Sequence, residues 1–289
     1  MRFRTKQKDY SKESFNQLNV ERSLLQDSIP MMTKHYKKVI LFGDSQFERS
    51  CDPSLSFCFP SALSYYYGRR ADVLNRGLSG YSSKWLRSQL SRVIAELEVL
   101  ERELNQQVAF LFIFWLGTND SCVEGVEHHV PISEFLRNVR SIISDVHSAF
   151  PHARVLLVTP APISISKIRD SNLRSDGSDR TQVATKEYAD ALLHCPVEIE
   201  PEKLRRIDLF EAIAAASGAK ITENTVEELQ TIDVNNFTVD GLHLNGDAYR
   251  ILYKLVLREL ENWPGMATKD IDGVEPGWAA KAKQFKEAL

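Results

Sequence analysis

The sequence is poor in cysteine, and its cysteines lie far apart. They are Cys51, Cys58, Cys122 and Cys195, with no C-x-x-C pair and no spacing typical of a metal site. The basic amino terminus also lacks the apolar segment of a secretory signal peptide. In a chain without a secretion signal, we expect these cysteines to be free thiols.

Long apolar runs, an excess of charge and phosphate-binding loops are missing as well. No apolar stretch approaches the roughly 20 residues that span a bilayer, and the longest, Val108 to Leu116, is typical of a strand buried on both faces. The net charge of −3 gives no electrostatic reason to bind nucleic acid or an anionic membrane. No Gly-x-Gly-x-x-Gly or Walker pattern supports nucleotide chemistry.

These absences favour a cytoplasmic protein without a membrane span. The sequon Asn119-Asp-Ser121 agrees weakly, because a glycan there would block the site proposed below. The sequence does not indicate an oligomeric state.

The composition, 43% hydrophobic and 26% charged, is that of a globular chain with room for one main domain and two tails. We expect a flexible amino-terminal extension over residues 1–35 and the main domain over 36–263. Residues 264–289 would form a carboxyl-terminal tail, with a possible short helix near its end.

Within the main domain, apolar strand-like runs alternate with amphipathic helical segments, as in a parallel sheet with crossover helices. The expected fold is a three-layer α/β/α sandwich around a central, mainly parallel five-stranded sheet. Expected strands are 38–42, 71–74, 108–116, 154–159 and 206–209, and expected helices are 60–67, 83–106, 132–149, 181–193, 210–217 and 245–263. The polar segment 161–180 is either a substrate-facing lid or a surface loop without a role.

Two short motifs carry residues suited to nucleophilic catalysis. The first strand ends in Phe42-Gly-Asp-Ser45, and Asp240-Gly-Leu-His243 lies near the other end of the chain. A serine hydroxyl needs a base within hydrogen-bond reach, and that base needs an acceptor that fixes its tautomer. Ser45, His243 and Asp240 can fill these three roles if the fold brings them together.

Two further expected strands break into glycine and polar residues, as strands do at the carboxyl edge of an α/β sheet. They lead into Asn75-Arg-Gly-Leu-Ser-Gly80 and into Gly117-Thr-Asn119. Acyl transfer needs donors aimed at the oxygen that becomes negative. The Gly80 N–H and the Asn119 side-chain amide are candidates, together with the Ser45 N–H.

The four blocks, in this order, resemble the SGNH (GDSL-type) esterase/lipase superfamily, and most closely its isoamyl acetate-hydrolysing esterase branch. The resemblance runs from about Val39 to Trp263. It implies a flavodoxin-like sheet, a Ser45–His243–Asp240 triad, and an oxyanion hole formed by Ser45, Gly80 and Asn119. It requires no metal or organic cofactor.

Two acidic residues beside these blocks, Asp44 and Asp120, are expected to brace the site rather than to react. The cluster Glu124, Glu127, His128 and His129 admits a metal site, but adjacent histidines do not share a helix face, which favours an acidic surface turn.

The sequence departs from the superfamily directly after the nucleophile. An aliphatic residue and a threonine usually follow Gly-Asp-Ser, whereas here Gln46 and Phe47 follow. A polar residue and a bulky one at these positions could re-aim the turn that carries an oxyanion N–H.

The expected function is hydrolysis of small acetate or short-chain acyl esters through an acyl-enzyme on Ser45. One alternative is a deacetylase or acyltransferase acting on a sugar or secondary metabolite. The other, from a different class, is a catalytically silent binding protein on the same fold, supported only by Gln46 and Phe47.

Overall fold

A computed structural model describes residues 34–171 and 177–273. The chain divides into two units, residues 1–35 and 36–289, and only Lys34 and His35 of the first unit are described. Most of the expected amino-terminal extension, and the expected short helix near the carboxyl terminus, therefore lie outside the described residues.

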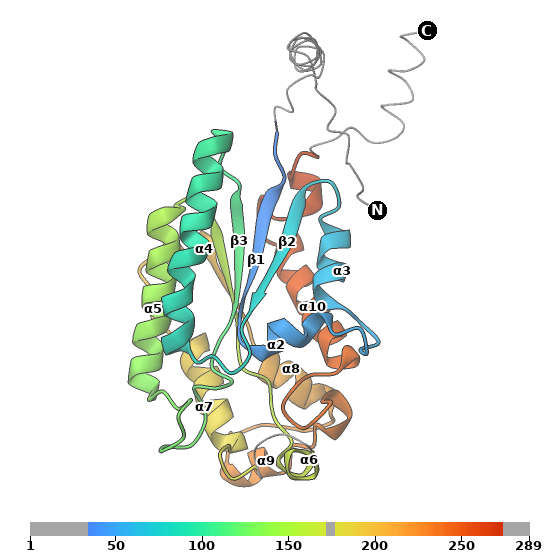
Figure 1. The fold of residues 1–289 in the computed structure, drawn as a ribbon. Coiled ribbons are helices and arrows are strands. Elements are labelled where there is room, and N and C mark those ends of the chain that lie inside the picture. The colour runs from blue at the N-terminus through green and yellow to red at the C-terminus, as the bar shows by residue number, and fades with distance from the viewer. Residues whose placement is uncertain (1–33, 172–176, 274–289) are drawn as a thin grey trace, which may run out of the picture. The chain divides into compact units, whose positions relative to one another are not determined.

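Five parallel strands form a single sheet in the order β2-β1-β3-β4-β5 (Figure 1). The strands are β1 (Lys37–Gly43), β2 (Ala71–Gly77), β3 (Ala109–Trp115), β4 (Arg154–Val158) and β5 (Leu204–Ile207). The predicted α/β fold with a central parallel sheet is confirmed, and the order is that of flavodoxin-like sheets. Since chain connections run outward in both directions from β1 and β3, the switch point lies between these two strands.

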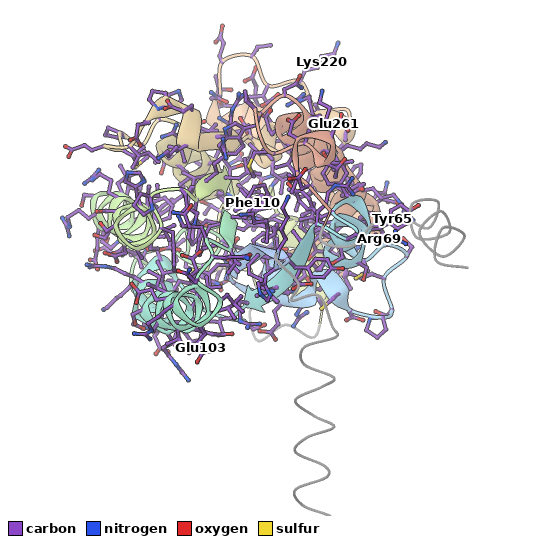
Figure 2. All side chains as sticks on the ribbon, turned by 90° about the horizontal axis from the view of Figure 1, so that it is seen from above. Tyr65, Arg69, Glu103, Phe110, Lys220 and Glu261 are labelled. Atoms are coloured by element: carbon purple, nitrogen blue, oxygen red, sulfur yellow. The ribbon has the colours of Figure 1, made fainter. Side chains whose placement is uncertain are left out.

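Helices cover both faces of the sheet. On one face lie α4 (Ser83–Leu104), α5 (Ile132–Ala149) and α7 (Gln182–Leu193); on the other lie α3 (Phe59–Tyr66), α8 (Leu209–Ala216) and α10 (Gly246–Glu261) (Figure 1). Alternation along β1 explains the two cores, because Val39 and Leu41 join one apolar cluster while Ile40 and Phe42 join the other. Seen along the strands, Phe110 lies inside the layers and Glu103 and Lys220 point outward (Figure 2).

Short elements complete the fold. They are α2 (Ser45–Glu48), α6 (Ile165–Asp170), α9 (Val226–Gln230) and the 3-10 turns η1 (Arg49–Cys51), η2 (Pro201–Lys203), η3 (Asn235–Phe237) and η4 (Thr268–Asp270). Within residues 34–171 and 177–273, no helix combines the length and apolarity needed to cross a membrane.

Two expected strands differ from their observed limits by more than one residue. The strand predicted at 206–209 lies two residues earlier, because η2 precedes it and Leu209 already begins α8. The strand predicted at 71–74 continues to Gly77, since β2 pairs with β1 along its whole length. Its last residues are the asparagine and glycine that read as a turn in the sequence.

Close packing at the carboxyl ends of the strands positions the loops of the site. A Cβ on Gly43 would lie 2.5 Å from the Trp115 carbonyl oxygen, and one on Gly77 would lie 2.2 Å from the Glu48 nitrogen. Gly77 lets α2 lie directly against the end of β2, and Gly43 lets the ends of β1 and β3 approach closely. The loops after β1, β2 and β3 therefore open onto one edge of the sheet.

Candidate active site

Ser45 is the first residue of α2 and follows β1 directly. The Asp44 side chain caps this helix by accepting a hydrogen bond of 2.9 Å from the Gln46 N–H. The cap holds the sharp strand-to-helix turn in place. Only 5% of Ser45 is exposed, so the hydroxyl lies at the floor of a pocket rather than at the surface.

A compact loop before α10 presents His243 to this serine. One carboxylate oxygen of Asp240, Oδ1, accepts hydrogen bonds from the backbone N–H groups of Leu242 and His243, at 3.0 and 2.8 Å. The other, Oδ2, lies 2.7 Å from His243 Nδ1. On the opposite side of the ring, His243 Nε2 lies 2.9 Å from Ser45 Oγ. The structure thus joins all three residues in one line of hydrogen bonds.

The Asp240 carboxylate stays ionised in this arrangement. Burial alone would raise its pKa, but the hydrogen bonds from the His243 side chain and backbone outweigh burial and lower the pKa to about 2. An ionised Asp240 accepts the Nδ1 proton of His243. This leaves Nε2 free to accept the Ser45 proton.

Arg49 lies beside the same carboxylate. Its Nη1 is 3.4 Å from Asp240 Oδ2 and 3.2 Å from His243 Nδ1. Arg49 Nη1 and His243 Nδ1 both carry protons, so both nitrogens donate toward the Asp240 carboxylate. The sequence analysis missed Arg49, which begins η1 directly after α2, four residues after Ser45.

The two candidate oxyanion donors lie around the same pocket as Ser45. Gly80 has a φ of +78°, a left-handed conformation that favours glycine. The Asn119 amide nitrogen donates to the Tyr81 carbonyl at 2.9 Å, and its oxygen accepts from Arg180 Nη2 at 3.1 Å. These two contacts fix the orientation of the amide and leave one N–H hydrogen of Asn119 for the pocket.

Arg180 is a second pocket residue that the sequence analysis did not single out. It is 8% exposed, and besides Asn119 it donates to the Thr118 carbonyl. It lies at the end of the polar segment 161–180, more than 60 residues after its partners. No local spacing in the sequence connects the two regions.

The pocket above Ser45 has a volume of about 230 Å³. Its lining residues come from five separate loops: Ser45, Arg49, Ser79, Gly80, Asn119, His128, Ile168, Asp179, Arg180, Leu242 and His243. Trp115 and Leu116, at the carboxyl end of β3, do not line it, because both are fully buried in the core. Leu78 and Tyr81, in the loop after β2, pack against the apolar cluster to which α4 contributes.

The described residues of the segment 161–180, which are 161–171 and 177–180, do not form a loop throughout. It contains α6, and Ile163 and Ile168 form a small apolar cluster with Leu242 of the His243 loop. The Ser164 N–H also donates to the Gly241 carbonyl at 2.8 Å. The segment thus packs against the loop that carries the histidine.

Asp44 and Asp120 are both fully buried, and burial raises their pKa values, to about 6 and about 7. Each carboxylate accepts hydrogen bonds from the start of a helix. Asp44 does so at α2, and Asp120 accepts from the Ser83 N–H at 2.9 and 3.1 Å at the start of α4. The two carboxyl groups therefore contact the starts of the helices that follow β1 and β2.

No metal centre is seen in the expected acidic cluster. Among residues 34–171 and 177–273, no three histidine, cysteine, aspartate or glutamate side chains gather closely enough to hold an ion. His129 Nδ1 lies 2.5 Å from the Cys122 carbonyl oxygen. His128 lies in a turn, packs edge-on against Trp85 and also lines the pocket that contains Ser45, a contact that the prediction of an acidic surface turn did not include.

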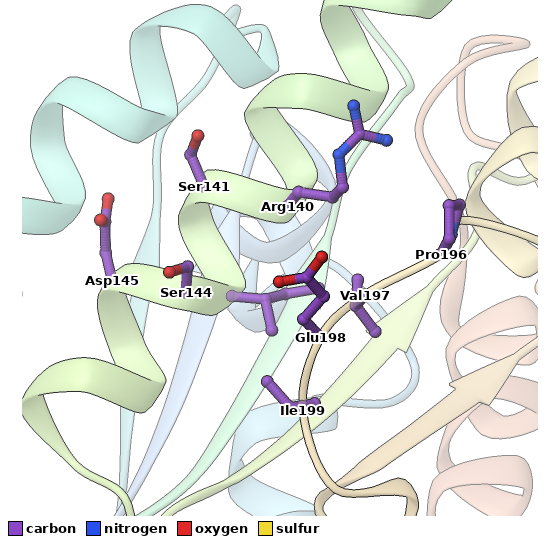
Figure 3. Close-up of a pocket in the computed structure, with 9 residues that line it drawn as sticks. Arg140, Ser141, Ser144, Asp145, Pro196, Val197, Glu198 and Ile199 are labelled. Carbon is purple, nitrogen blue, oxygen red and sulfur yellow. The ribbon is translucent and has the colours of Figure 1, made fainter.

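A larger hollow of about 610 Å³ lies between α5 and residues 196–199 (Figure 3). Arg140, Asp145 and Glu198 are among its lining residues. None of the candidate catalytic residues borders it. Volume alone therefore does not identify the pocket that holds the candidate catalytic residues.

Known proteins resemble this chain in sequence and in fold. Residues 41–251 match the family described as GDSL-like Lipase/Acylhydrolase. The isoamyl acetate-hydrolyzing esterase of Saccharomyces cerevisiae is 30% identical over 236 residues, which cover 79% of this chain and 87% of the yeast protein. The isoamyl acetate-hydrolyzing esterase 1 homolog of Rattus norvegicus is 28% identical, covering 83% and 90%.

Among solved structures, a catalytic mutant of an acetylxylan esterase from Geobacillus stearothermophilus superposes with a TM-score of 0.51 at 17% identity. The match covers 77% of this chain and 93% of that one. At this identity the likeness concerns the fold. The family match spans most of the chain, and its ends fall in β1 and α10, the elements that flank Ser45 and His243. The chain therefore belongs to the GDSL-like lipase/acylhydrolase family of carboxylic ester hydrolases.

Proposed function

We propose that this protein hydrolyses small acetate or short-chain acyl esters by two-step acyl transfer. The observation that carries the proposal is the line of hydrogen bonds from Ser45 Oγ through His243 to Asp240, with distances of 2.9 and 2.7 Å. Ser45 attacks the ester carbonyl while His243 Nε2 takes its proton. His243 then gives that proton to the departing alcohol. Water repeats the sequence on the acyl-enzyme and releases the acid.

Three donors would hold the developing oxyanion: the backbone N–H groups of Ser45 and Gly80 and the free side-chain N–H of Asn119. All three residues line the pocket that contains Ser45 Oγ. Donors fixed in advance stabilise the transition state because they need no reorganisation during the reaction. The contacts of Asn119 with Tyr81 and Arg180 fix its amide in this sense.

The size of the pocket favours a small acyl group. Its 230 Å³ lies below the roughly 300–1,000 Å³ of sites for drug-sized ligands. Ile168 and Leu242 add apolar surface to its wall. The names of the yeast and rat relatives, which specify isoamyl acetate, support the same substrate class.

A fluorophosphonate probe and p-nitrophenyl acetate test the proposal together. Wild-type protein should be labelled at Ser45, and Ser45→Ala should lose both labelling and hydrolysis. Ser88→Ala, which removes an exposed hydroxyl on α4, should retain both. Absence of labelling in folded wild-type protein would support the silent binding protein instead.

A polar hollow beside the catalytic pocket supports acetylated sugars as a second candidate substrate class. It shares Arg180 with the catalytic pocket and has a volume of about 610 Å³. Hydroxyl and amide side chains line it, among them Ser164, Ser166, Thr181, Gln230 and Asn235. Such groups suit sugar hydroxyls. Higher kcat/KM on acetylated xylooligosaccharides than on isoamyl acetate would assign this class.

A further inference from the structure

The residue that follows the nucleophile reaches across to the histidine loop. Gln46 is fully buried, and its side-chain Nε2 donates to the Leu242 carbonyl at 2.9 Å. Its Oε1 accepts from the Leu244 N–H at 3.4 Å. Leu242 and Leu244 flank His243 on either side. One amide side chain thus contacts the backbone immediately before and immediately after the base.

The backbone of Gln46 is itself firmly held. Its N–H donates to Asp44 Oδ1 at 2.9 Å, and its carbonyl accepts from the Tyr249 hydroxyl at 2.5 Å. The next residue, Phe47, is fully buried and packs against Phe59 and Trp115 with ring centroids 6.1 and 5.4 Å away. The start of α2 therefore forms a fixed base from which the Gln46 side chain extends.

We propose that Gln46 is a positioning residue that sets the distance between His243 Nε2 and Ser45 Oγ. It acts through the backbone of Leu242 and Leu244 and does not touch the substrate. The inference rests on the proposed acyl-transfer function. It also gives the departure from the family pattern a role, because an aliphatic residue at this position could make neither hydrogen bond.

Two physical points explain why the hydrogen bonds of Gln46 to Leu242 and Leu244 should affect the rate. Ser45 and His243 lie on different loops, 198 residues apart in the chain, so their alignment depends on contacts between those loops. Misplacement of a reacting group by about 1 Å can cost roughly 100-fold in rate. Without Gln46, a buried carbonyl and N–H beside His243 would lose their partner, which favours a shift of the loop.

Gln46→Met tests the inference, because methionine has a similar length but offers neither the amide donor nor its acceptor. We expect kcat on p-nitrophenyl acetate to fall about 10- to 100-fold while KM changes less than about 2-fold. The rate of fluorophosphonate labelling at Ser45 should fall in parallel. A purely structural role would lower thermal stability without this separation of kcat from KM.

Tyr67→Phe is the matched control. The Tyr67 hydroxyl is also buried and also donates to a distant backbone carbonyl, that of Met266 at 3.1 Å, but it lies close to the amino end of β2. This variant should lower Tm comparably and keep the wild-type kcat. If Gln46→Met does not fold, Gln46→Ile, which carries a residue usual for the family, should show the same loss of kcat.

The outcomes separate the two proposals. Wild-type kcat and wild-type labelling in Gln46→Met, or in Gln46→Ile where that variant replaces it, would overturn the positioning role and leave the proposed function intact. Absence of labelling in the wild type would overturn the proposed function itself. A rise in kcat in Gln46→Ile would also contradict the inference.

Discussion

At the scale of single residues, the orientation of one side-chain amide depends on a distant arginine. An asparagine amide can flip its oxygen and nitrogen, and only one orientation directs an N–H into the pocket. Arg180 bonds to the oxygen of Asn119 and so selects that orientation. Removing either residue should therefore affect the same step of the reaction.

We predict that Asn119→Ala lowers kcat by roughly 100- to 1,000-fold, as the loss of one oxyanion donor usually does. Arg180→Ala should lower kcat less, by about 10-fold, because the donor remains but is no longer held. The double variant should resemble Asn119→Ala alone, since the two residues act as a unit. Steady-state kinetics on p-nitrophenyl acetate measure all three, and additive losses would contradict the coupling.

The candidate catalytic residues were accessible to sequence reasoning, whereas the residues that contact them across the fold were not. Ser45 and Asn119 directly follow apolar strands, and Asp240 precedes His243 at a short, chemically meaningful spacing. Arg180, Arg49 and the Gln46 contacts depend on how loops pack in three dimensions. For Gln46 the sequence predicted a possible disturbance, and the structure shows hydrogen bonds that span the two halves of the site.

At the scale of elements, the contact between α6 and the histidine loop depends on one glycine. Gly241 has a φ of +92°, and a Cβ there would lie 2.5 Å from both the Ile168 nitrogen and the Ser164 carbonyl oxygen. These are backbone atoms, which cannot yield as a flexible side chain can. Only glycine permits this close approach.

Gly241→Ala should destabilise the protein by about 3 kcal/mol or more, because overpacking adds to the strain of a left-handed backbone. It should also lower kcat by moving the loop that carries His243. Gly218→Ala is the control, since Gly218 has a φ of +88° but open space around it. That variant should lose about 1–2 kcal/mol and retain kcat. Denaturant unfolding and steady-state kinetics test both, and equal effects would contradict the packing role of Gly241.

Elements with a clear apolar period were predicted well, and short ones were not. The limits of α5 agree with the expected helix, since Pro131 and Pro151 flank it. In β5, Arg205 and Arg206 interrupt the apolar pattern that predicts a strand. Their side chains are accommodated by distant partners, since Arg205 contacts Glu259 and Arg206 donates to the Cys195 carbonyl. The helix α6 has only six residues, most of them polar, so it shows no apolar period. Its apolar partner Leu242 lies far along the chain.

At the scale of the whole molecule, two buried carboxyl groups link stability to pH. The pKa of Asp120 rises from 3.8 to about 7, and that of Asp44 to about 6, chiefly through burial. The folded protein therefore binds more protons than the unfolded chain between pH 3.8 and these values, and stability falls as pH rises through this window. Asp240 acts in the opposite direction. Its lowered pKa adds stability above pH 3.8, and this stability is lost as pH falls from 3.8 towards 2.

Asp120→Asn should therefore remove part of the loss of stability between pH 5 and pH 8. This carboxyl accounts for roughly 3 kcal/mol of that loss, because its pKa of about 7 lies about two pH units above the lower limit of this range. Thermal melts of the wild type and the variant across this range measure it. Asp145→Asn, which removes an exposed carboxyl on α5, should leave the slope unchanged. A steeper slope in Asp120→Asn would show that the assigned sign is wrong.

The distance between the two halves of the site along the chain also governs when the protein becomes active. Asp240 and His243 form their contact within three residues, so it can form early and locally. Ser45 meets His243 only across 198 residues, after the strands between them have paired. During synthesis the nucleophile emerges first and its base among the last elements. Recovery of ester hydrolysis during refolding therefore reports this final docking, and it should lag behind the recovery of helix content.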